Sequence, residues 1–186
     1  MSPRTSRRSV VLGLVAMPSL VRAQSAWPAQ IIKFVVPFAP GGSTDILARV
    51  VGQKLEAPLK ASILIENRPG AGGSVAANAV AKAVPDGHTF MMGHIGTLAF
   101  TPSLYPNLPY DPVKDFAPVA LVATVPNILA VHPSVPARSF AEFVAHAKAN
   151  PGKLSYGSGG IGSAAHVAGA YLASAAGFDA LHVPYR

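Results

Sequence analysis

Three glycine-rich loops hold the residue types that can capture an anion. They span residues 37–45, 67–74 and 156–163 and read PFAPGGSTD, NRPGAGGS and YGSGGIGS. Each loop lies between a pattern typical of a strand and one typical of a helix. Unpaired backbone N–H groups would then lie at the positive end of a helix, where an anion is favoured. The loops therefore predict a site that holds a small acid.

Hydroxyl side chains in the first and third loops add donors to this predicted site. They are Ser43, Thr44, Ser158 and Ser163. Backbone N–H groups and hydroxyls can bind a carboxylate without an arginine. Two neighbouring side chains have alternative roles. Asp45 is either a first-turn helix charge or a residue facing the cleft, where it would receive an amine or order water. Phe38 is either a core residue or one wall of the ligand pocket.

Six histidines raise the question of metal or acid–base chemistry. They show no close pair at metal-ligand spacing on one helix, so no metal site is expected. His94 follows a predicted strand and can face a ligand. His166 lies one turn into a predicted helix, where it either faces the ligand or packs and hydrogen-bonds a neighbouring loop.

Catalytic and cofactor motifs are weak in this chain. Gly157, Gly159 and Gly162 match the GxGxxG dinucleotide fingerprint, but a single match after a short strand is not specific, and no GxxxxGK[ST] loop occurs. No serine lies in a GxSxG elbow. We therefore expect no cofactor and no enzymatic activity. The alternative from another class is an enzyme of the same architecture that uses Asp45 or His166 as a general base.

Alternating strand and helix patterns would position these loops. Residues 31–36, 62–66 and 89–93 read as strands, and 43–55 and 75–84 as helices, the first capped by Ser43 or Thr44. Strands separated by helices predict βαβ units and a mostly parallel sheet. Ligands of such sheets collect beyond the carboxyl ends of the strands, where the loops lie.

The second half continues this alternation after a different connection. Residues 119–131 read as an apolar strand pair broken at Pro126-Asn127, a predicted hinge between two lobes. A helix over 140–150 capped by Ser139, a strand over 153–156, a helix over 164–176 and a strand over 181–183 follow. We expect one lobe over residues 24–125 and a second over 126–186.

The first 23 residues read as an export signal. Arg4, Arg7 and Arg8 precede an apolar stretch over 10–21 and a small-residue cleavage site, and the paired arginines fit either a plain secretory or a twin-arginine signal. Twelve apolar-biased residues are too few for a stable membrane anchor. Export predicts a periplasmic protein.

Net charge and cysteine content argue against nucleic-acid binding and cysteine chemistry. Removing the four arginines of this segment from the 15 basic residues leaves 11 against 8 acidic residues, a net charge of +3. The remaining basic residues are scattered, so no nucleic-acid partner is expected. The chain has no cysteine, which excludes disulfides and thiol chemistry.

Several longer motifs in order resemble the Bug family, the extracytoplasmic solute receptors of tripartite tricarboxylate transporters. They are VVPFAPGGSTD over 35–45, ENRPGAGG over 66–73, YDP over 110–112 followed by DF at 115–116, NPGKL over 150–154, YGSG over 156–159, and HVPY over 182–185. The resemblance implies a type II periplasmic-binding-protein-like α/β fold, with two lobes and mostly parallel sheets closing on a small carboxylate. It implies delivery of that ligand to the membrane permease subunits of a transporter. Family members usually continue well beyond the HVPY stretch, so an incomplete second lobe is expected.

The resemblance also implies which residues face the ligand. It assigns the loop from Phe38 to Asp45 to the first lobe, the stretch from His94 to Thr97 to a third ligand-facing loop, and the loop from Ser158 to Ser163 with His166 to the second lobe. The expected ligand-binding residues are Phe38, Ala39, Gly41, Gly42, Ser43, Thr44, Asp45, His94, Thr97, Ser158, Gly159, Gly162, Ser163, His166 and Tyr185. A remnant or sensor without a transport role is the other alternative.

Overall fold

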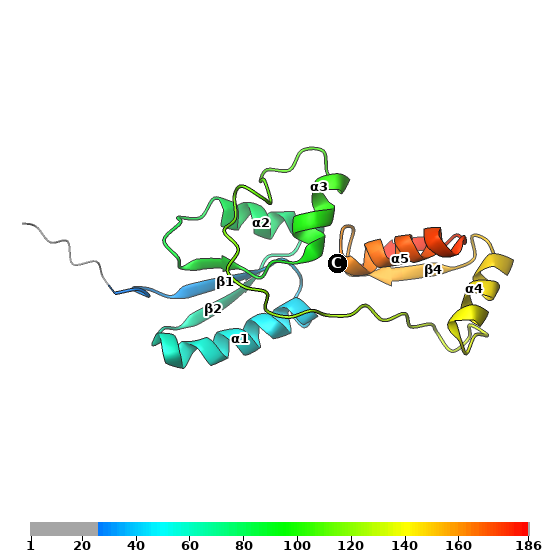
Figure 1. Ribbon diagram of the computed structural model, residues 1–186, viewed down its shortest axis with the longest axis horizontal. Helices are drawn as coiled ribbons and strands as arrows, with labels where there is room; N and C mark the ends of the chain where they lie inside the picture. Colours follow the sequence, from blue (N-terminus) through cyan, green and yellow to red (C-terminus); the bar gives the residue numbers. More distant parts are fainter. Residues whose placement is uncertain (1–25, 186) are drawn as a thin grey trace, which may run out of the picture.

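The computed structural model describes residues 26–185 and contains two βα units joined by a long connection (Figure 1). We call residues 32–104 the N-terminal unit and residues 140–184 the C-terminal unit. The predicted export signal lies outside the described residues. Within residues 26–185, none of the helices combines the length and the apolar character needed to cross a membrane.

A three-stranded parallel sheet forms the centre of the N-terminal unit. Its strands are β1 (Ile32–Val36), β2 (Ile63–Asn67) and β3 (Thr89–Met91), in the order β2-β1-β3. Phe34 lies opposite Ile65 of β2 and Phe90 of β3. The predicted parallel sheet is confirmed, because a helix between each pair of consecutive strands returns the chain to the same end of the sheet.

Two helices cover opposite faces of this sheet, α1 (Ser43–Leu59) on one and α2 (Ser74–Ala81) on the other (Figure 1). The core under α1 is made by Ile32, Phe34, Val36 and Ala48. Gly52 of α1 lies directly against β2, where an added Cβ would come within 3.2 Å of Ile63. This close approach lets the helix pack flat on the strand.

The helix starts differ from the predicted caps in one detail. Gly42, and not Ser43 or Thr44, occupies the N-cap position of α1, and no side chain caps it. The carboxylate of Asp45, in the first turn, accepts the Gly41 N–H instead, at 2.9 Å. A side chain inside the helix thus satisfies a donor just before it, and the predicted hydroxyl cap is wrong.

A helical segment absent from the sequence prediction follows β3. It consists of a π-helical stretch η2 (Gly96–Phe100) and a single turn α3 (Thr101–Leu104). Thr101 donates its hydroxyl to the Gly96 carbonyl at 2.7 Å, and Tyr110 donates to the Thr97 carbonyl at 2.8 Å. These side-chain bonds to η2 carbonyls hold the segment in place, although its sequence lacks a helical apolar period.

The predicted strand pair over 119–131 is wrong. The segment has no regular secondary structure and runs as an extended chain between the two units (Figure 1). Its apolar side chains face solvent, with Leu121 83% and Ile128 86% exposed. A strand needs a hydrogen-bonded partner, and among the described residues this segment has none.

The C-terminal unit is a second parallel βα arrangement. It consists of α4 (Phe140–Ala149), β4 (Ser155–Ser158), α5 (Ala164–Ala176) and β5 (Leu181–Pro184), with β4 and β5 paired in parallel. Ser139 caps α4 by accepting the Glu142 N–H at 3.3 Å, which confirms that local prediction. The unit has one sheet of two strands, so its helices are only partly covered.

Candidate functional site

The first glycine loop is held by a buried carboxylate. Asp45 is 3% exposed and accepts hydrogen bonds from Gly41 N at 2.9 Å, Asn67 Nδ2 at 2.9 Å and Arg49 Nε at 3.0 Å. These bonds, the Arg49 one first, hold the pKa of Asp45 well below its usual range. Both carboxylate oxygens are occupied by the protein's own donors. Asp45 therefore shapes the loop and faces inward in this structure.

Two aromatic rings meet at the edge of this loop. Phe38 and His94 lie edge to face with ring centroids 4.9 Å apart. Asn67 donates to the Phe38 carbonyl at 3.1 Å, and Gly96 N donates to His94 Nδ1 at 3.0 Å. Burial lowers the pKa of His94, so its neutral form is favoured. Phe38 is half-buried and therefore forms part of the rim and not of the sheet core.

The second glycine loop is tied to the helical segment after β3. Thr97 donates its hydroxyl to the Gly72 carbonyl at 3.0 Å. Gly73, with φ of +92°, lies so close to Thr97 and Pro37 that a Cβ would collide with both. Thr97 is fully buried, so the structure places it behind the loop, where it supports the loop backbone.

The third glycine loop is organised around Ser158. Its Oγ lies 2.6 Å from His182 Nε2, 3.2 Å from Gly160 N and 3.1 Å from Gly160 O. His166 Nδ1 accepts the Gly162 N–H at 3.2 Å, and Ser163 caps α5 by accepting the His166 N–H at 3.3 Å. His166 thus makes the hydrogen bond to a neighbouring loop that was one of its two predicted roles.

Most of the remaining predicted residues lie on the open side of these loops. Ala39, Gly41, Gly42, Ser43, Gly159 and Tyr185 are exposed, whereas Thr44 and Gly162 are buried. The Tyr185 ring lies over Gly157, where an added Cβ would come within 3.2 Å of Cε2. The predicted set therefore divides into residues whose surface is open and residues that support the loop backbone from below.

The second and third loops come together between the two units. An ideal Cβ on Gly96 would collide with the Gly162 carbonyl, and one on Gly72 would lie 2.9 Å from the Ile161 carbonyl. The absence of side chains at Gly72 and Gly96 allows the C-terminal unit to approach this closely. The carboxyl ends of both parallel sheets thus lie near one another (Figure 1).

Sequence reasoning missed two residues of this arrangement as site residues. Asn67 joins Phe38 and Asp45, and His182 contacts Ser158 from the neighbouring strand. Asn67 ends β2, which was the available signal, whereas His182 is the second residue of β5 and gave no such signal. His182 also stacks on His166 with ring centroids 4.0 Å apart and 28° between the planes.

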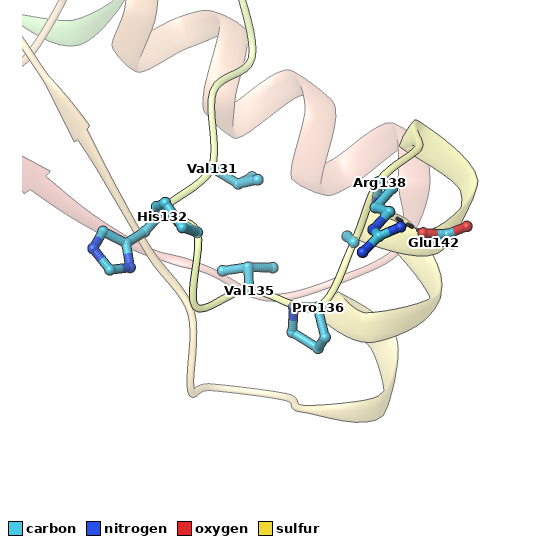
Figure 2. Close-up of a pocket in the computed structure, with 8 residues that line it drawn as sticks. Val131, His132, Val135, Pro136, Arg138 and Glu142 are labelled. Carbon is cyan, nitrogen blue, oxygen red and sulfur yellow. Dashed lines mark hydrogen bonds between the residues drawn. The ribbon is translucent and has the colours of Figure 1, made fainter.

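A hollow elsewhere in the molecule contains none of the predicted site residues. It has a volume of about 490 Å³ and is bounded by the chain from Val131 to Glu142 (Figure 2). It is partly open to solvent, and Glu142 there accepts the Arg138 backbone N–H at 2.7 Å. In residues 26–185 no three histidine or acidic side chains gather where they could hold a metal ion. The glycine loops therefore remain the candidate site.

Comparison with known proteins gives one consistent result. Residues 47–186 match the family described as tripartite tricarboxylate transporter family receptor. A UPF0065 protein from Pseudomonas sp. strain P51 is 41% identical over 184 residues, which cover 97% of this chain and 54% of that protein. The chain thus spans about half the length of the curated relatives it matches.

Solved structures share the fold. A periplasmic transporter superposes with a TM-score of 0.79 at 44% identity, covering 86% of this chain and 54% of that one. Rhodopseudomonas palustris MatC, solved with malate, has a TM-score of 0.79 at 38% identity, covering 85% and 54%. An R. palustris protein solved with adipate has a TM-score of 0.79 at 38% identity, covering 86% and 53%. The predicted periplasmic-binding-protein fold class is confirmed.

Proposed function

Because the chain belongs to the tripartite tricarboxylate transporter receptor family, we propose that it captures a small organic dicarboxylate between its glycine loops. The observation that carries this proposal is the approach of the third loop to the second loop, at Ile161 with Gly72, and to η2, at Gly162 with Gly96. A ligand at this junction would contact loops from both units. Contacts of that kind couple binding to closure of the two units.

The donors on these loops are neutral, which suits a carboxylate. Gly42 precedes α1, and Gly159 and Ile161 precede α5. Their N–H groups have no acceptor among the described residues, and each helix adds its positive end. The nearest buried charge, Asp45, is already compensated by Arg49. A carboxylate of the ligand would therefore not meet an uncompensated negative charge of the protein.

The proposed ligand class follows from the similar structures that were solved with a bound acid. Malate and adipate are both dicarboxylates of moderate length, and they occupy proteins that are 38% identical to this chain. Two carboxylates can engage two loop systems at once. The half-buried pair Phe38 and His94 offers an apolar edge for the carbon chain between them.

Location and partners follow the family. We propose that the protein acts in the periplasm, where it presents the bound acid to the membrane subunits of a tripartite transporter. We propose no chemical step on the ligand. The alternative, an enzyme with Asp45 or His166 as general base, would require a free base, and the oxygens of Asp45 are occupied by Gly41, Asn67 and Arg49.

Calorimetric titration of residues 24–186 with malate and with adipate tests this proposal. Binding by the unchanged chain is expected, with Phe38→Ala weakening it and Phe143→Ala, which removes a ring packed on Phe178 in the C-terminal unit, serving as control. The ligand recovered afterwards should be chemically unaltered. Absence of heat with both acids, in a chain that melts cooperatively, would contradict the proposed ligand class, and consumption of either acid would favour the enzyme.

A further inference from the structure

The pair of Ser158 and His182 joins two strands beneath the third glycine loop. Ser158 ends β4 and His182 lies in β5, and their side chains meet with 2.6 Å between Oγ and Nε2. Ser158 is 8% exposed, so water contributes little to its hydrogen bonding. What this hydroxyl does is therefore decided by its protein partners.

The hydrogen-bonding capacity of the Ser158 hydroxyl indicates which ring nitrogen of His182 carries a hydrogen. A hydroxyl donates one hydrogen bond and accepts two. Oγ accepts from Gly160 N, and its remaining neighbours are Gly160 O and His182 Nε2. With a hydrogen on Nε2, the hydroxyl accepts from His182 and donates to the Gly160 carbonyl, so all three contacts become hydrogen bonds. Without that hydrogen, one proton would have to serve two acceptors.

The state of the His182 ring agrees with this arrangement. Burial lowers the pKa of His182, and the stacked His166 lowers it further. The ring is then neutral near pH 7 and carries one hydrogen. His166 accepts the Gly162 N–H through Nδ1, so Nδ1 of that ring carries no hydrogen. Tyr156 of β4 packs against His182 with ring centroids 5.0 Å apart.

The turn fixed by Ser158 presents free donors on its outer side. Among the described residues, the N–H groups of Gly159 and Ile161 have no hydrogen-bond acceptor, whereas those of Gly160, Gly162 and Ser163 do. The space beside Gly159 is open, because no atom of the described chain lies within 4 Å of where a Cβ would stand. The direction of these two N–H groups depends on the turn that Ser158 closes.

We propose that His182 is a positioning residue of the ligand site, which acts through the Ser158 hydroxyl to hold the Gly159 and Ile161 N–H groups toward a bound carboxylate. This inference rests on the proposed function for its ligand class. It adds to that proposal a residue of β5 that lies outside the three glycine loops. Removing the Nε2 hydrogen should release the turn while the sheet below it remains.

Two substitutions separate the hydrogen bond from the packing of the ring. His182→Phe keeps an aromatic ring between Tyr156 and His166 but deletes the donor. His182→Gln keeps an N–H at the same reach but removes the ring. We expect His182→Phe to weaken malate and adipate binding about tenfold and His182→Gln to retain most of it, as suits the loss of one positioned hydrogen bond. His132→Phe, in an exposed loop, is the matched control.

A double-mutant cycle tests whether the effect passes through Ser158. Ser158→Ala and His182→Phe should each weaken binding, and the double variant should be little worse than either, because both remove the same hydroxyl contact. Fully additive losses would overturn the proposal. So would weaker binding by His182→Gln than by His182→Phe, since packing would then be the cause.

Measurements without ligand test the positioning role of His182 independently of the proposed ligand class. Nitrogen NMR of His182 should show hydrogen on Nε2 at pH 7.5, and amide exchange at Gly160 should accelerate about tenfold in His182→Phe but not in His182→Gln. A bare Nε2, or unchanged exchange at Gly160, would overturn the positioning role. If the unchanged chain binds neither acid while these signals appear, the ligand class is wrong and the positioning of the turn holds.

Discussion

Asn67 Nδ2 donates to Asp45 Oδ1 at 2.9 Å and thereby fastens the end of β2 to the first turn of α1. The same amide nitrogen also reaches the Phe38 carbonyl at 3.1 Å. One side chain thus fixes the loop between β1 and α1 from two sides. Because Asn67 itself opens the second glycine loop, it also couples that loop to the first.

Asp45→Ala should lower the free energy of unfolding by about 3 kcal/mol, because the Gly41 N–H and the Asn67 amide each lose a hydrogen bond to a charged acceptor. Arg49→Ala should cost much less, because the Arg49 side chain is about half exposed and its ion pair is partly solvated. Urea unfolding of both variants measures the difference. Equal losses would show that the ion pair, and not the loop hydrogen bonds, dominates.

Gly96→Ala should disturb the contact between the two units. The new methyl group would collide with the Gly162 carbonyl and lie 3.0 Å from His94 Nδ1, so the third loop must move away. Gly159→Ala is the matched control, since its methyl group would meet open space. Amide exchange over residues 160–163 should rise in Gly96→Ala alone. Unchanged exchange in both variants would contradict the observed approach of the loops.

Acid should destabilise the protein in two steps. The folded state lowers the pKa of His94 and His182 from the ordinary 6.5, so these rings add nothing at high pH and cost stability as the pH falls below that value. The pKa of Asp45 is lowered from 3.8, so its contribution is present above that pH and is lost further down. Melting temperatures from pH 8 to pH 2 should show the first step and the start of the second.

Substitution of His94 and His182 tests whether these two histidines cause the first loss of stability on acidification. The double variant His94→Gln and His182→Gln should melt at nearly the same temperature at pH 7.5 and pH 5.5, because neither position then titrates in that range. His132→Gln should keep the pH dependence of the unchanged chain. A drop between these pH values as large in the double variant as in the unchanged chain would assign the step to other groups.

The exposed connection should limit solubility. Leu121→Lys with Ile128→Lys replaces two apolar side chains that are 83% and 86% exposed. The variant should remain monodisperse to higher concentration in light scattering, with its melting temperature unchanged. Val84→Lys with Val113→Lys adds the same charge at other exposed apolar positions and is the control. An equal gain from the control pair would mean that net charge, and not this segment, is responsible.

Local patterns were enough to predict most elements. The apolar spacing in 43–55 led to α1, and Ser139 led to the start of α4, because periodicity and capping depend on residues within a few positions. The strand prediction over 119–131 was wrong for a related reason. β-branched residues favour an extended chain, but a strand also needs a partner, which short-range sequence does not report.

The sequence by itself determined the alternation of strand, glycine loop and helix, and so the places where an anion could be held. The tertiary structure alone decided that Asp45 turns inward to Asn67, that Gly96 approaches Gly162, and that Ser158 meets His182 across 24 residues. Turns and helices are encoded by neighbours along the chain. Contacts between distant residues depend on how the elements pack, and a single stretch of sequence does not encode that packing.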